Sequence, residues 1–202
     1  SDTLKPVKNV FVHRGKLVRG SIEVGTHVEA KVNAAQRMKT RINHSVTHVL
    51  HATLAEVLGD HIKQAGSLVT PDYLRFDFTH FKALTAEEMR KIESTINARI
   101  RENHLVNTAE MSLDSAIKAG AKAFFDEKYE ESVRVLSMGS FSKELCGGTH
   151  AERLGEAGLF KITSESSVAS GVRRIVAVTG EKAYEEVLRA EDLIQKLRDL
   201  LK

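Results

Sequence analysis

The sequence predicts an α+β fold in which an antiparallel sheet packs against helices, with part of a small β-barrel before it and a helix after it. Three observations support this prediction. Short β-rich pieces separated by glycine occupy residues 1–33, helical and alternating patterns succeed one another over residues 34–180, and a helical pattern returns over residues 181–202. These ranges are the three predicted domains: part of a small β-barrel, a central domain and a C-terminal helix.

The first range contains three β-rich pieces, at residues 9–12, 16–18 and 27–32, with a turn predicted through His13-Arg14-Gly15. Short strands of this kind resemble the remnant of a small barrel. The chain begins with Ser1 rather than methionine, so we expect it to be a piece of a longer protein.

One long amphipathic helix is predicted over residues 34–58. Glycine is absent from this stretch, and Gly59 follows it as a stop signal. The apolar residues recur at helical spacing, at Ile42, Val46, Val49, Leu50, Leu54, Val57 and Leu58. One face of this helix should therefore be buried.

A strand pair and a second helix are predicted next. Residues 66–69 and 73–78 have the composition of strands, and the second of them alternates apolar with charged side chains. Thr85 and Glu88 form a capping box at the start of a helix that ends near Asn103. The apolar face of this helix should lie on the sheet.

The remaining chain is predicted to form shorter elements and a closing helix. Strands are expected at residues 105–111, 133–137, 159–163 and 174–178, and a short helix at residues 114–119. In residues 181–202 the leucines and isoleucines are spaced like the start of a long or coiled helix. We expect this helix to continue into a segment outside the chain.

Composition favours a protein that folds in water without disulfide bonds. The chain has 202 residues, 42% of them hydrophobic, and its single cysteine, Cys146, cannot form an intramolecular disulfide. A reducing compartment, the cytoplasm, is therefore expected. No apolar run approaches the roughly 20 residues of a membrane span, so no membrane is expected as a partner. A net charge of +3 is too small to identify a partner.

Two histidines of the first predicted helix, His44 and His48, share one face. At about 100° per residue they lie about 40° apart and roughly opposite the apolar stripe, so they are not spaced as core residues. His51 lies within about 20° of His44 by the same reckoning. A pair of this kind alone occurs by chance in many proteins.

A thiol and a further imidazole, Cys146 and His150, are separated by Gly147-Gly148-Thr149. The glycines let the backbone turn tightly and direct both side chains to one point. Imidazoles with one thiolate suit zinc, whereas magnesium and calcium prefer oxygen ligands. Together the two pairs predict a zinc site around which the helices and sheet pack. Both a closed structural site and an open catalytic site are compatible with this pattern.

The two motifs, residues 43–48 (NHSVTH) and 144–150 (ELCGGTH), resemble the paired signature of the alanyl-tRNA synthetase editing domain and its free-standing AlaX-type relatives. Threonyl-tRNA synthetase carries a more distant version. The similarity runs from about Leu17 to Gly180, and it includes residues 64–69, 74–78 and 171–175.

This resemblance implies the ligands of the zinc ion, which are His44, His48, Cys146 and His150. It also implies that the protein hydrolyses serine or glycine wrongly esterified to alanine tRNA. Thr47 and Gln64 match positions that the family uses near the mischarged amino acid. The partners implied are the acceptor end of alanine tRNA and the remainder of a synthetase chain. Val46, where many relatives carry alanine, is the one departure that we notice.

Basic residues offer candidates for contacts with tRNA phosphates near the acceptor end. Arg173 and Arg174, close to Gly171, would suit a loop that approaches a nucleic-acid backbone closely. Arg37 and Lys39 are weaker candidates. The alternative for every such cluster is an ordinary solvated surface.

The expected chemistry can be argued from the substrate. An aminoacyl ester has a competent leaving group, so a positioned water and stabilisation of the oxyanion suffice. A pocket built for alanine cannot exclude the smaller glycine and rejects the serine hydroxyl only about 10²-fold, so a second site must remove the errors. A hydroxyl on Thr47 or an amide on Gln64 that needs the serine hydroxyl as its partner would reject alanine.

Three other functions remain open. The chain could be a tRNA-docking module whose zinc only clips the Cys146 loop to the helix, a free-standing AlaX-type trans-editing protein, or a zinc amidohydrolase of small molecules. The polar set Thr47, Gln64 and Thr149 argues against a purely structural clip. The lack of a His-Glu-x-x-His motif argues against the amidohydrolase.

Overall fold

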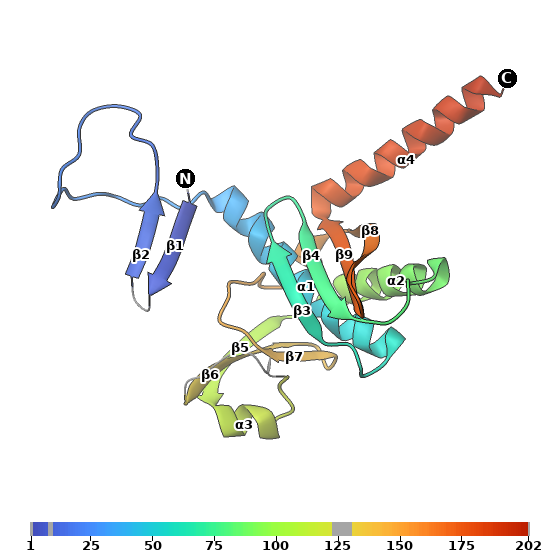
Figure 1. Ribbon diagram of the computed structural model, residues 1–202, viewed down its shortest axis with the longest axis horizontal. Helices are drawn as coiled ribbons and strands as arrows, with labels where there is room; N and C mark the ends of the chain where they lie inside the picture. Colours follow the sequence, from blue (N-terminus) through green and yellow to red (C-terminus); the bar gives the residue numbers. More distant parts are fainter. Residues whose placement is uncertain (1, 8–9, 123–130, 202) are drawn as a thin grey trace. The chain divides into compact units, whose positions relative to one another are not determined.

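A computed structural model describes residues 2–7, 10–122 and 131–201 (Figure 1). The chain divides into two compact units, Ser1–Val32 and Asn33–Lys202. Over the described residues it is a mixed fold with four α-helices and antiparallel sheets, as the sequence predicts.

The first unit contains a β-hairpin in its described residues. Strand β1 (Asp2–Val7) pairs antiparallel with β2 (Val10–Arg14), and its remaining described residues, 15–32, form no strand, so no closed barrel is present in this part of the chain. The predicted strands at 16–18 and 27–32 are therefore wrong, and the predicted turn at His13-Arg14 lies inside β2. Two strands without a second layer cannot bury their apolar side chains, and Phe11 is 62% exposed.

The second unit begins with the long helix α1 (Ala34–Leu58), whose bounds match the prediction. The side chain of Asn33 accepts a hydrogen bond from the Gln36 amide and so caps the first turn. Gly59 follows with φ of 111°, in a conformation that favours glycine. Between residues 43 and 54 every residue is buried except His44, which is half-buried.

A four-stranded antiparallel sheet has the order β3-β4-β9-β8. Its strands are β3 (Gln64–Val69), β4 (Leu74–Thr79), β8 (Phe160–Ala169) and β9 (Val172–Thr179). In the centre of the sheet Phe76 pairs with Ile175, and both are fully buried. They share one hydrophobic core with Val46 and Leu50 of α1, so this face of the sheet is the one covered by the helix.

Helix α2 (Ala86–Glu102) packs into the same core through Ile92, Ile96 and Ile100. The predicted capping box is present: Glu88 donates its backbone amide to the Thr85 hydroxyl, and its carboxylate accepts the Thr85 amide. The helix ends at a residue in the left-handed conformation, as helices commonly do.

A smaller three-stranded sheet has the order β5-β6-β7, with β5 (Val106–Ser112), β6 (Ser132–Met138) and β7 (Ser142–Leu145). Its own small core includes Ala116 of the short helix α3 (Leu113–Lys118) together with Val135 and Leu145. Strand β7 was not predicted from the sequence. It matters because the Cys146–His150 segment follows it directly and leads into the 3-10 turn η1 (Leu154–Ala157).

Helix α4 (Gly180–Leu200) closes the described chain, close to the predicted start at residue 181. Its first turn buries Ala183, whereas its later apolar side chains, such as Leu193 and Leu197, are exposed. None of the helices in the described residues has the length and apolarity needed to cross a membrane.

Candidate metal centre

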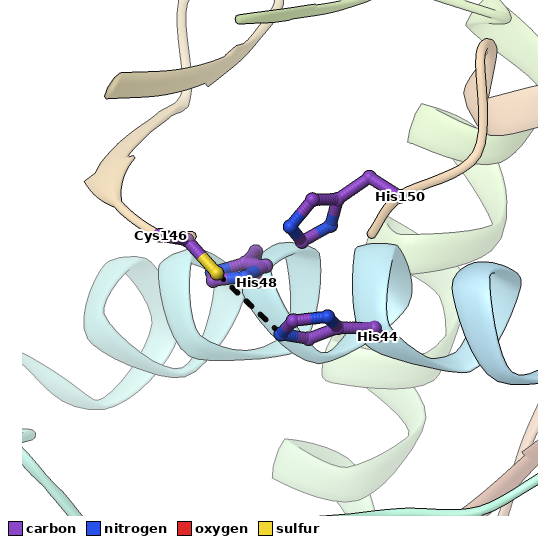
Figure 2. A group of neighbouring side chains, drawn as sticks. All are labelled: His44, His48, Cys146 and His150. Carbon is purple, nitrogen blue, oxygen red and sulfur yellow. Dashed lines mark hydrogen bonds between the residues drawn. The ribbon is translucent and has the colours of Figure 1, made fainter. Parts of the chain in front are cut away.

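Four side chains from distant parts of the sequence converge beside α1 (Figure 2). His44 and His48 project from the same side of α1, while Cys146 and His150 come from the segment after β7. Each offers one ligand atom, and these four atoms lie within 4.8 Å of one another. The Cys146 Sγ is 3.6 Å from Nε2 of His44. The convergence predicted from the two motifs is therefore present, and the cluster could hold a metal ion.

Each of the three imidazoles is oriented through its Nδ1 atom, so that Nε2 is left for the cluster. The Nδ1 contacts are His44 with the Thr149 carbonyl at 3.2 Å, His48 with the Glu144 carboxylate at 2.5 Å, and His150 with the Ser45 hydroxyl at 3.5 Å. Histidine ligands of metals ordinarily have their other ring nitrogen held in this way.

Two of the inward nitrogens lack a partner. Among the described residues, Nε2 of His48 and Nε2 of His150 are buried and have no hydrogen bond. Buried polar atoms are normally paired, and an unpaired imidazole nitrogen beside a thiol suits a metal ion as its missing partner. The residues present therefore fit a metal ion.

Two arginines, Arg134 and Arg41, hold the segment that carries Cys146 and His150 in place. Arg134 binds it twice: its carbonyl accepts the Cys146 amide at 3.0 Å, and its guanidinium donates to the Gly148 carbonyl. Arg41 donates from Nε to the His150 carbonyl at 2.5 Å. Nothing in the sequence connects these arginines with the loop, because the contacts form only on folding.

Glycine is required at one position of this segment by a close approach. A Cβ atom on Gly148 would lie 2.2 Å from Cε1 of His44, whereas a Cβ on Gly147 would meet nothing within 4 Å. The close packing of Gly148 on the His44 ring brings the loop within reach of the helix.

The Cys146 thiol is activated by its surroundings. Burial raises its pKa, but the neighbouring imidazoles of His150, His44 and His48 outweigh burial and lower the pKa to about 3. A lowered pKa favours the thiolate, which is the form that binds metals.

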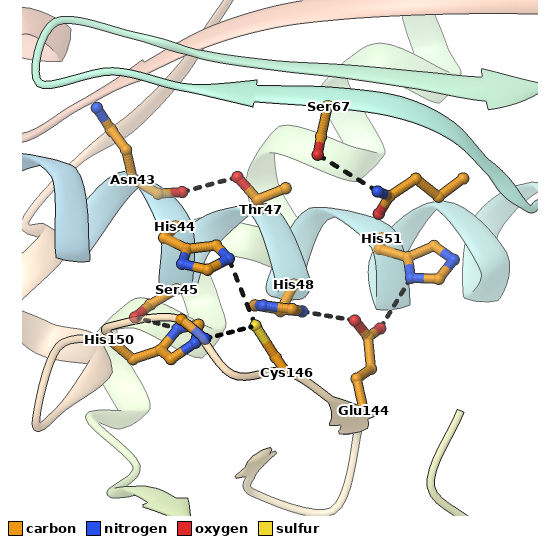
Figure 3. Close-up of polar contacts among 12 residues, drawn as sticks. Asn43, His44, Ser45, Thr47, His48, His51, Ser67, Glu144, Cys146 and His150 are labelled. Carbon is orange, nitrogen blue, oxygen red and sulfur yellow. Dashed lines mark hydrogen bonds and ion pairs between the residues drawn. The ribbon is translucent and has the colours of Figure 1, made fainter. Parts of the chain in front are cut away.

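Glu144 is a buried carboxylate directly behind the cluster, and its side chain lies between His48 and His51 (Figure 3). Burial raises the pKa of Glu144, but its contacts with the two histidines outweigh this and lower the pKa to about 2. Burial lowers the pKa of His48, while Cys146 and Glu144 outweigh it and raise the pKa to about 9. In the sequence, Glu144 stands only as the first residue of the second motif, and the shared face of His48 and His51 was the one signal that could have pointed to it.

Thr47 and Gln64, the two predicted substrate residues, lie outside the four-residue cluster. Thr47 is buried in α1 and donates its hydroxyl to the Asn43 carbonyl at 2.8 Å. Gln64 begins β3, and its amide donates to the Ser67 hydroxyl at 3.3 Å. Figure 3 shows Ser67 of β3 on the α1 side of its strand. The contact of Thr47 and Gln64 with a substrate stays a prediction.

Arg173 and Arg174 are placed differently from the expectation. Both lie in strand β9 rather than in a loop, and adjacent strand residues point to opposite faces of the sheet. Arg173 makes two hydrogen bonds to Glu165, at 2.5 and 2.7 Å, and Arg174 makes two to Asp77, both at 2.7 Å. Each guanidinium is thus already engaged by a carboxylate, which weakens the case for both as phosphate contacts.

The two weaker candidates for phosphate contacts are more exposed to solvent than the arginines of β9. Arg37 and Lys39 are exposed near the start of α1, and Lys39 forms only a surface contact, at 3.4 Å, with Glu181 of α4. A surface ion pair of this kind contributes little to stability, so Lys39 can readily leave Glu181 and bind another anion.

Comparison with known proteins finds similarity to tRNA synthetases. Residues 133–176 match the family model described as the threonyl and alanyl tRNA synthetase second additional domain, a range that contains Cys146 and His150. Over 201 residues the chain is 50% identical to an alanine–tRNA ligase of Nitrosomonas eutropha. The match covers 100% of this chain and 23% of that protein, so the chain spans about a quarter of the relative's length. These findings confirm the resemblance of the chain to the alanyl-tRNA synthetase editing-domain type, which the two motifs carry.

Proposed function

We propose that this chain is the editing domain of an alanyl-tRNA synthetase and hydrolyses serine or glycine wrongly attached to alanine tRNA. The observation that carries the proposal is the cluster itself: three imidazoles and one thiolate converge beside α1, the helix that also carries Thr47. The relative is named an alanine–tRNA ligase, and an enzyme that charges alanine has a physical need for a correcting site.

Zinc is the metal that we assign to the cluster. Three nitrogens and one sulfur are borderline-soft donors, and zinc accepts them in tetrahedral geometry. The residues that would hold it are His44, His48, Cys146 and His150. When bound, zinc would supply Lewis-acid stabilisation of the charge that develops on the ester carbonyl oxygen.

The residues of the chain would select the substrate. Thr47 Oγ1 gives its hydrogen to the Asn43 carbonyl, so toward a ligand it can only accept a hydrogen bond. A serine hydroxyl can donate to it, and alanine cannot. Gln64 would pair in the opposite sense: its amide, which donates to the Ser67 hydroxyl at 3.3 Å, would donate to the serine hydroxyl instead. Alanine would then leave a polar group unpaired, at a cost of about 1–3 kcal/mol.

The tRNA and the rest of a synthetase are the partners that this proposal requires, in the cytoplasm. We place the acceptor end near the start of α1, where Arg37 and Lys39 are exposed. The editing role within a longer chain is favoured over a free-standing protein, because the chain aligns from end to end with a segment of a much longer relative.

A non-catalytic alternative has one observation in its favour. Four protein ligands are typical of a closed structural zinc site, whereas catalytic sites usually keep one position open. In that case the metal would clip the Cys146 segment to α1 and the unit would only dock tRNA.

Hydrolysis of charged tRNA by the purified chain separates these functions. We expect serine-charged and glycine-charged alanine tRNA to be hydrolysed, alanine-charged tRNA to be spared, and activity to vanish with a chelator and return with zinc. If the chain binds one equivalent of zinc but hydrolyses none of these tRNAs, the non-catalytic docking function is supported instead. Thr47→Val is the control that separates substrate selection from metal binding, because it removes the proposed selecting hydroxyl and keeps all four ligands.

A further inference from the structure

A single carboxylate joins two histidines of α1, and only one of them belongs to the cluster. The Glu144 oxygens lie 2.5 Å from Nδ1 of His48 and 2.8 Å from Nδ1 of His51. Glu144 is 1% exposed and His51 is 5% exposed, so water does not compete for these contacts. Buried carboxylates are rare unless they are paired, and this one has two partners on one helix.

The direction of these hydrogen bonds follows from the carboxylate. An ionised carboxylate accepts hydrogen bonds and cannot donate, so Nδ1 of each ring must be the donor. For His48, this orients the ring so that Nε2 faces Cys146 and His150 (Figure 3). The carboxylate therefore sets both the rotation of the His48 ring and the nitrogen that it offers.

His51, unlike His48, is not one of the clustered side chains. It lies three residues after His48, which puts both rings on adjacent turns of one helix face. Its ring packs on Phe76, with the ring centroids 5.3 Å apart, and it is not part of the group whose ligand atoms converge. It is linked to the centre through the second oxygen of Glu144.

The contact also joins two layers of the fold. Glu144 belongs to β7, which pairs with β6 in the small sheet, whereas both histidines belong to α1. Cys146 follows Glu144 by two residues, so the hydrogen bonds that orient His48 also hold the strand end from which the thiol projects.

We propose that Glu144 is the positioning residue of the metal centre and that His51 is its anchor: His51 fixes Glu144, and Glu144 orients His48 for the metal. The inference rests on the proposed function only in taking the cluster as a metal site. It does not depend on whether the chain hydrolyses tRNA.

Metal binding by substituted chains tests the proposal directly. Glu144→Gln keeps the size of the side chain but can no longer accept two Nδ1–H groups equally. We expect zinc affinity, measured by competition with a chelating dye, to fall about 10- to 100-fold. The visible absorption of the cobalt-loaded protein should also change, because the ligand field responds to the orientation of His48. Glu93→Gln is the matched control, since Glu93 is also a doubly bonded carboxylate, with Lys161 and the Ile162 amide, away from the cluster.

Two variants at His51 separate positioning from packing. His51→Leu removes the donor and should weaken zinc binding, while His51→Asn restores a donor close to the position of Nδ1 and should recover most of it. If Glu144→Gln fails to fold, as judged by melting of the metal-free protein, this pair still tests the proposal because Glu144 is intact. In the double variant Glu144→Gln with His51→Leu, no loss beyond that of Glu144→Gln is expected.

The proposal is overturned if Glu144→Gln binds zinc like the unsubstituted chain and its cobalt spectrum is unchanged. It is overturned for His51 if the Leu and Asn variants bind zinc equally well, or if the two losses add in the double variant. A chain that binds zinc in this Glu144-dependent way but hydrolyses no charged tRNA would refute the proposed function and leave this inference standing.

Discussion

Cys146 is the residue whose loss should be most damaging to the metal centre, because it is the chain's single thiol and the imidazoles of the cluster surround it. Removing it leaves three nitrogen donors with no anionic ligand among them. We expect Cys146→Ala to lose stoichiometric zinc while the core, which is formed mainly by α1, α2 and the larger sheet, stays folded. Elemental analysis of the purified variant, with circular dichroism as the check on folding, measures this. Full zinc content in the variant would show that the assigned ligand set is wrong.

Thr47 is where we expect the selection of serine over alanine to reside. Thr47→Val keeps the shape of the side chain and removes the oxygen that can accept a serine hydroxyl. The loss should be about 1–3 kcal/mol, or about 5- to 150-fold in the ratio of kcat/KM for serine-charged to alanine-charged tRNA. The comparison is made at equal zinc content. An unaltered ratio would transfer the role to Gln64.

The segment between β7 and η1 offers a test at the scale of one structural element. Gly148→Ala places a methyl group 2.2 Å from the His44 ring, which must then rotate out of the cluster. We expect weaker zinc binding in a chain that still folds, because the ring can move without disturbing the core. Gly147→Ala is the matched control, since its methyl group meets no atom within 4 Å. Equal zinc affinity in the two variants, by dye competition, would contradict the close approach.

The start of α1 and strand β9 should respond differently to loss of charge. Replacing Arg37 and Lys39 by glutamine should flatten the salt dependence of tRNA binding, by about 0.7–0.9 in the logarithmic slope for each phosphate that is no longer neutralised, with little change in melting temperature. Replacing Arg173 or Arg174 should instead lower the melting temperature, because Glu165 and Asp77 would be deprived of their partners. Binding titrations across a salt series, with thermal melts, distinguish the two. A changed slope only in the β9 variants would restore the original assignment.

At the scale of the whole molecule, the chain divides after Val32, and every element of the metal centre belongs to the second unit. Both hydrophobic clusters also belong to it. We therefore expect residues 33–202 alone to unfold cooperatively, with a melting temperature close to that of the longer chain and an unchanged zinc content. Calorimetry of the two chains is the measurement. A non-cooperative transition in the shorter chain would show that the hairpin unit contributes to the core.

The elements that could be predicted from the sequence are those set by near neighbours. The bounds of α1 follow from the Asn33 cap, the recurring apolar residues and Gly59, and the start of α2 follows from the Thr85–Glu88 capping box, all within a few residues of one another. The ligand motifs could be found in the same way, because histidines four apart on a helix share a face whatever the rest of the fold does.

Only the tertiary structure decided the contacts between segments that lie far apart in the chain. Arg174 pairs with Asp77, and Glu144 contacts His48 and His51, across separations of 97, 96 and 93 residues, so spacing along the chain does not identify these partners. The described residues of the first unit form no closed barrel for the same reason, since closure of a sheet depends on the partner strands rather than on a strand's own residues. The sequence by itself determined which side chains could bind a metal. Folding determined which groups hold these side chains in place. A buried carboxylate or guanidinium is shielded from water, so it can pair only with a group that the fold brings next to it.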